Sequence, residues 1–191
     1  LQLVERGFTD AVMFTAAAEE TGEKLVRGRD DAYCGLLNAY STLGLRERRP
    51  HIPERPVGTA DDVAGMIASF LPAARVLLGL KRLKIFSFGP RPQDFLACNA
   101  PIKPLYDLGV EIMENSELDL YDLYLSAGED PAVPSVAKEM AAELGSGNRY
   151  PDLLKKLARY EIALTRFMER NLGASAYAVF ANKCWPAFEK Y

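Results

Sequence analysis

The sequence contains little of what disulfide frameworks, metal sites and cysteine nucleophiles require. It has 191 residues but only 3 cysteines and 1 histidine. Cys34, Cys98 and Cys184 are odd in number and far apart, which favours reduced thiols in a cytoplasmic protein over a disulfide framework. No HxH, HExxH or CxxC pattern occurs, and His51 lies in a proline-rich connection. We therefore predict no metal site and no Cys–His nucleophile in this sequence.

An excess of charge of one sign is also lacking. The net charge of -3 comes from 23 basic and 26 acidic residues, so the electrostatic footprint of nucleic-acid binding is absent. The most hydrophobic stretch, residues 63–80, contains Pro72 and Arg75, and we interpret it as a buried helix rather than a membrane span. No secretory signal pattern opens the chain, which starts at Leu1 and stops at Tyr191 without a cap, so we expect a fragment of a larger multidomain protein.

Apolar runs alternate along the chain with amphipathic segments. Thr59 with Asp62, and Ser116 with Asp119, have the spacing of capping boxes at helix starts. The alternation indicates an α/β fold, with a Rossmann-like open parallel sheet and helices on both faces. We expect strands at residues 11–15, 83–88, 110–113 and 176–180, and helices at residues 31–43, 59–80, 134–144 and 151–172.

The turn after the strand at 83–88 stands where many α/β proteins carry a phosphate-binding loop. It reads GPRP, and Pro90 and Pro92 each remove a backbone N–H donor that such a loop would need. Neither GxGxxG nor GxxxxGK[ST] occurs in the sequence, which argues against a nucleotide-dependent enzyme. Arg91, held between the two prolines, could bind a polar ligand or another subunit, or it could be a solvated arginine.

A second candidate site directly follows the strand at 176–180. Lys183, Cys184 and Trp185 stand together at a predicted strand end, where the ligand sites of parallel sheets are built. Alternatively, the tryptophan is a core or interface aromatic, the cysteine a small buried group and the lysine a surface charge.

Four segments, in this order and spacing, resemble the L-fucose isomerase and L-arabinose isomerase family, most closely its fucose-isomerase-like branch. They are RDDAYCGLL at 29–37, KIFSFGPRPQDF at 84–95, the long helix at 151–172 and KCWPAF at 183–188. The resemblance implies that residues 1–82 are the C-terminal part of a first α/β unit. Residues 83–191 would then be a second, truncated α/β unit of a protein that assembles as a homo-oligomer.

The same resemblance implies an aldose–ketose isomerase that uses Mn²⁺ and an enediol mechanism, with its metal ligands outside this fragment. This chain would contribute no catalytic residue and would be inactive alone. It would supply the wall of the sugar pocket and subunit contacts, with no nucleic-acid or membrane partner. The alternative from another class is a non-catalytic α/β sugar-binding or regulatory module. The substrate-binding residues implied are Arg91, Lys183, Cys184 and Trp185.

Overall fold

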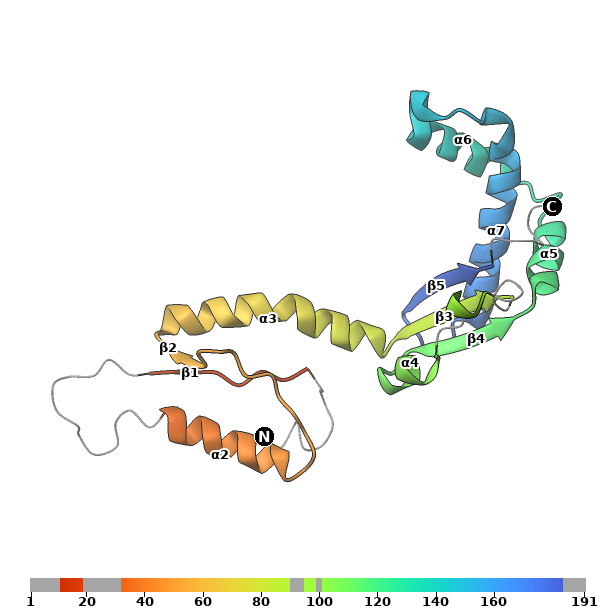
Figure 1. Cartoon of the computed structure of the whole chain (residues 1–191). Helices are drawn as coiled ribbons and strands as arrows, with labels where there is room; N and C mark the ends of the chain where they lie inside the picture. The colour runs from red at the N-terminus through yellow and green to blue at the C-terminus, as the bar shows by residue number, and fades with distance from the viewer. Residues whose placement is uncertain (1–10, 19–31, 90–94, 99–100, 184–191) are drawn as a thin grey trace. The chain divides into compact units, whose positions relative to one another are not determined.

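The chain combines short parallel sheets with helices, in two compact units (Figure 1). The computed structural model describes residues 11–18, 32–89, 95–98 and 101–183. Unit 1 comprises Leu1–Lys81 and unit 2 comprises Arg82–Tyr191, and each is described by itself. Parallel strands connected through helices occur in both units, which confirms the predicted α/β class.

Unit 1 contains two short parallel strands and two helices. The strand predicted at 11–15 is displaced, because Met13 forms only an isolated bridge with His51 and the strand itself follows at Ala16–Ala17. Its partner strand lies inside the proline-rich segment at 46–58, where proline and charge obscured it. The elements are β1 (Ala16–Ala17), α2 (Ala32–Gly44), β2 (Val57–Gly58) and α3 (Ala60–Leu80).

Helix α3 begins as predicted, but its environment differs from the prediction. Thr59 is the N-cap, its hydroxyl accepts from the Asp62 backbone N–H, and the Asp62 carboxylate accepts from the Thr59 N–H, which completes the capping box. The Thr59 hydroxyl also donates to the Asp62 carboxylate, and this bond together with the one from the Thr59 N–H holds the pKa of Asp62 below its ordinary value. The interpretation of α3 as a buried helix is wrong, since none of its residues is buried in the structure described.

Unit 2 is built on a three-stranded parallel sheet with the order β4-β3-β5. Ser116 caps α5 through the predicted capping box with Asp119. Gly173, with a φ of +63°, follows α7. The elements are β3 (Leu83–Phe88), α4 (Lys103–Asp107), β4 (Glu111–Asn115), α5 (Glu117–Ser126), α6 (Val133–Leu144), α7 (Leu154–Asn171) and β5 (Tyr177–Asn182), with short 3-10 turns at Leu96–Cys98, Gly145–Gly147 and Pro151–Leu153.

The core of unit 2 lies between the sheet and the helices α5 and α7. Phe86 and Phe88 are fully buried and point to the same face of β3, because alternate side chains of a strand share a face. They pack against Leu120 of α5 and Phe167 of α7. The side chains of β3 that point the other way are half-buried, so one face of this strand is more deeply buried than the other.

The connections between the three strands run in opposite directions. The chain leaves β3 for β4 through α4, then passes back across β3 to β5 through α5, α6 and α7. Right-handed crossovers place these two connections on opposite faces of the sheet. The carboxyl ends of β3 and β5 therefore border a topological switch point, the usual location of a ligand site in an open parallel sheet.

Candidate functional site

The two turns that the sequence singled out start side by side. Phe88 of β3 is the register partner of Asn182 of β5, and the backbone N–H of Lys183 donates to the Phe88 carbonyl at 3.2 Å. The GPRP turn and the KCWP segment thus begin at neighbouring strand ends on one edge of the sheet. Of the four predicted site residues, Lys183 lies within the structure described. Arg91, Cys184 and Trp185 lie outside the described residues and stay predictions.

Lys183 forms an ion pair with Glu117, the first residue of α5. Its Nζ lies 2.8 Å from Glu117 Oε1, and the two side chains are only 11% and 24% exposed. No other hydrogen-bond donor reaches this buried oxygen among the described residues. A pair so shielded from water is a stronger constraint than a surface salt bridge, because losing either partner leaves a poorly solvated charge.

Gly89 makes room for this pair at the end of β3. Its φ of +82° lies in the left-handed region, and its N–H donates to the carbonyl of Asn115, the last residue of β4, at 2.9 Å. A Cβ at this position would stand 2.7 Å from Glu117 Cγ, closer than real Cβ contacts come. Both the backbone angle and the approach of Glu117 therefore require glycine here.

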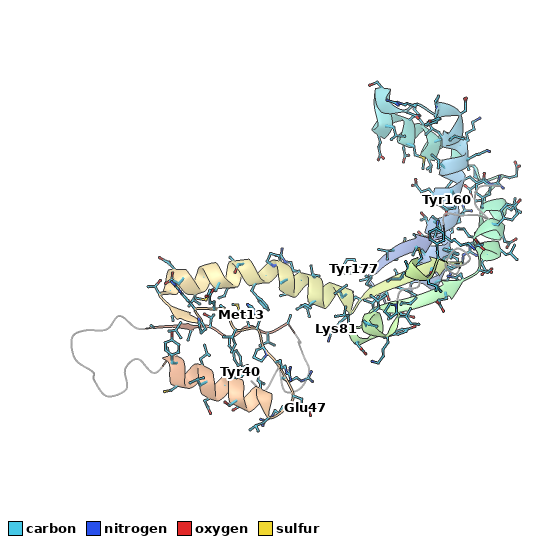
Figure 2. All side chains as sticks on the ribbon, in the orientation of Figure 1. Met13, Tyr40, Glu47, Lys81, Tyr160 and Tyr177 are labelled. Carbon is cyan, nitrogen blue, oxygen red and sulfur yellow. The ribbon has the colours of Figure 1, made fainter. Side chains whose placement is uncertain are left out.

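Tyr160 adds a hydroxyl to the carboxyl end of β5. It comes from α7 and is labelled in Figure 2, and its hydroxyl accepts a hydrogen bond from the side-chain amide of Asn182. Partial burial raises the pKa of Tyr160 above the ordinary tyrosine value, and the Asn182 bond opposes that rise in part. Tyr160 is thus a neutral hydroxyl at physiological pH, able to donate as well as accept.

Sequence reasoning missed Glu117 and Tyr160. Glu117 stands in the first turn of a capped helix, where the helix dipole already accounts for an acid. The signal that could have found it is its position just after a strand end, beside the two turns already selected. Tyr160 lies within an amphipathic helix that packs on the core, and no local pattern separates it from the other apolar positions there.

The described residues offer hydrogen-bonding groups but not a metal site. The Lys183–Glu117 ion pair and the Asn182–Tyr160 hydrogen bond supply an ammonium, a carboxylate, an amide and a hydroxyl around the end of β5, and groups of these kinds can bind the hydroxyl groups of a polar ligand. Within the same part of the chain, no three His, Cys, Asp or Glu side chains come together as ion ligands. Glu117 is moreover engaged by Lys183, so these residues do not fit Mn²⁺.

Comparison with known proteins finds a match for the residues of unit 1. Residues 2–81 match the family model of the fucose/sulfoquinovose isomerase N-terminal domain, while a search of curated proteins finds no match. The matched segment ends where unit 1 ends, so the strand ends of unit 2 lie beyond it. The match supports the fucose-isomerase-like resemblance, and of the four segments that suggested it the match includes RDDAYCGLL at 29–37. Residues 2–81 are thus similar to the N-terminal domain of fucose/sulfoquinovose isomerases, which supports a fucose isomerase-like family fragment.

Proposed function

We propose that this chain is part of a cytoplasmic aldose–ketose isomerase resembling L-fucose and L-arabinose isomerases, to which it contributes one wall of the sugar pocket and subunit contacts. The family match of residues 2–81 supports the sugar-isomerase assignment. The observation that supports a sugar-binding role is the shielded Lys183–Glu117 pair at the switch point between β3 and β5.

The chemistry of the pair favours a neutral sugar. The ammonium of Lys183 donates to sugar hydroxyls and the carboxylate of Glu117 accepts from them, while the two charges cancel. The family description names fucose, which is uncharged, and sulfoquinovose, which carries a sulfonate. An anion gains little from a lysine that is already paired, so we expect these residues to favour fucose or another neutral aldose.

Isomerisation itself needs more than the described residues supply. Moving a carbonyl between C1 and C2 through an enediol calls for a carboxylate base and a divalent ion such as Mn²⁺. The described residues contain no ligand set for this ion, so we assign the metal to residues outside them. The role proposed for this chain is to bind and orient the sugar, and the chain alone is expected to be inactive.

Sugar binding by the full chain tests this role. Calorimetric titration with L-fucose and with L-arabinose should detect binding, and Lys183→Met/Glu117→Gln should weaken it by about tenfold or more, the usual effect of losing a charge-assisted hydrogen bond. The double change leaves no buried charge unpaired. Lys103→Met is the matched control, because Lys103 is an exposed lysine paired with Asp107 on α4. Equal weakening by both variants, or no binding by the unmodified chain, would contradict the proposal.

Turnover separates the isomerase from the alternative. A longer chain that continues past Tyr191 should convert L-fucose or L-arabinose to the ketose when Mn²⁺ is supplied. If that longer chain binds sugar at Lys183 without producing ketose, the non-catalytic sugar-binding module is the better description.

A further inference from the structure

Helix α3 presents an apolar surface that the other described residues of unit 1 (11–18 and 32–59) do not cover. Ile67 is 45% exposed, Leu71 46% and Leu78 43%. By length and composition α3 could even cross a membrane. Helices this apolar are normally buried, so something is expected to cover this one.

One face of α3 already contacts other residues of unit 1. Met66, Phe70 and Leu77 line a hollow together with Met13 and His51, and the rings of His51 and Phe70 stack with their centroids 5.6 Å apart. Figure 2 marks Met13 on the strand side of the helix. These contacts account for about one face of α3 and leave the neighbouring face to be explained.

The neighbouring face follows the spacing of a coiled-coil seam. Its apolar residues are separated alternately by four and three positions, which keeps them on one line along the helix. Pro72 lies off this line, and the helix is continuous through it. We name these residues the outer stripe, and all but the half-buried Ala74 are exposed: Ala60, Ala64, Ile67, Leu71, Ala74 and Leu78.

We propose that the outer stripe docks against the outer stripe of a second copy of this chain, with the two helices antiparallel. In this register Ile67 packs beside Leu71 of the second copy, and the reverse pair is identical by two-fold symmetry. Ala64 then meets Ala74 and Ala60 meets Leu78. The outer layers therefore pair alanine with leucine, the next layers pair alanine with alanine, and the two central layers each pair isoleucine with leucine.

The charges beside the outer stripe favour this orientation and this occupant. Asp61 and Arg75 each follow a stripe residue by one position and so flank the same side of the seam. An antiparallel pair brings Asp61 of one copy toward Arg75 of the other, twice by symmetry, whereas in a parallel pair in register the two residues stay 14 positions apart along the helices and cannot meet. A lipid bilayer would instead have to accommodate Arg75 within the apolar segment.

Sedimentation of the full chain tests the proposal. The unmodified chain should be dimeric, and Leu71→Asp should raise the dimer dissociation constant by at least tenfold, because it buries an unpaired carboxylate in the seam. Val76→Asp is the matched control: Val76 is 61% exposed on the same helix but lies off the stripe. Circular dichroism should show equal helix content in both variants. Equal dissociation by both, or none by either, would overturn the proposal.

Charge reversal and crosslinking test the orientation. Asp61→Arg and Arg75→Asp should each weaken the dimer, and the double variant should restore it. With the three native cysteines replaced by serine, a mixture of Ala64→Cys and Ala74→Cys chains should form a disulfide dimer, while neither chain should do so alone.

Two other results would identify a different occupant of the outer stripe. A monomer that floats with lipid vesicles would show that a membrane covers the stripe, and a monomer that does not bind vesicles would show that the chain covers the stripe itself. Either result overturns the proposal. The proposed dimer rests on the subunit contact put forward under the proposed function. Its test measures association and not sugar binding, so the dimer and the sugar site can fail separately.

Discussion

Replacing Gly89 with alanine perturbs the candidate site at a single atom. The backbone there has a φ of +82°, and an L-residue in the left-handed region costs about 1–2 kcal/mol. The added Cβ would also stand 2.7 Å from Glu117 Cγ and 3.1 Å from its Cδ. Because Glu117 is tied to Lys183 at 2.8 Å, it cannot swing away without breaking that pair, and overpacking of this kind costs about 1–3 kcal/mol. The sum predicts a loss of about 2–5 kcal/mol in the free energy of unfolding.

Gly173→Ala supplies the matched control for the backbone part of this loss. Gly173 also has a positive φ, +63°, but a Cβ there would meet no atom within 4 Å. Urea denaturation followed by circular dichroism should give a loss of only about 1–2 kcal/mol for this variant. In a Glu117→Ala background the clash is absent, so Gly89→Ala should then cost no more than Gly173→Ala. If Gly89→Ala costs as little as Gly173→Ala with Glu117 in place, the packing described for the site is wrong.

Three further changes test the core, a helix cap and a buried hydroxyl. Phe86→Ala should lower the free energy of unfolding by about 3–5 kcal/mol, because the ring is fully buried against Phe167; a loss under about 1 kcal/mol in chemical denaturation would argue against that packing. Ser116→Ala should cost about 1 kcal/mol by removing the side-chain acceptor of the α5 capping box, and an unchanged melting temperature would mean that the cap contributes nothing. Burial raises the pKa of Tyr160, so the unfolded chain ionises first and stability should fall as pH rises above about 10; Tyr160→Phe should show a shallower fall, and identical profiles for the two proteins would contradict this.

Much of the local structure could be predicted because its causes are local. The strand at Leu83–Phe88 is a mostly apolar run that includes Lys84 and Ser87, and both capping boxes place a hydroxyl and an acid three residues apart. The adjacency of the GPRP turn and the KCWP segment followed from the rule that ligand sites form at the carboxyl ends of parallel strands. The structure agrees in placing Gly89 and Lys183 at neighbouring strand ends.

What sequence reasoning missed depends on which surfaces meet. The apolar composition of α3 predicted burial, but composition does not say whether the covering surface belongs to the same unit, and here no α3 residue is buried. The short strand β1 pairs with β2 inside a proline-rich segment, and pairing of two residues leaves no periodic pattern to detect. Glu117 was identified as a site residue only through its contact with Lys183. The two residues follow different strands, β4 and β5, and are far apart in the sequence.

The central claim is that the carboxyl ends of β3 and β5 bind a sugar. Chemical-shift mapping of the isotopically labelled full chain during titration with L-fucose addresses it most directly. The account predicts saturable shifts of the backbone amides of Gly89, Glu117, Asn182 and Lys183, with little change in α2 or α3. Saturable shifts confined to other segments, or no shifts at any sugar concentration, would contradict it.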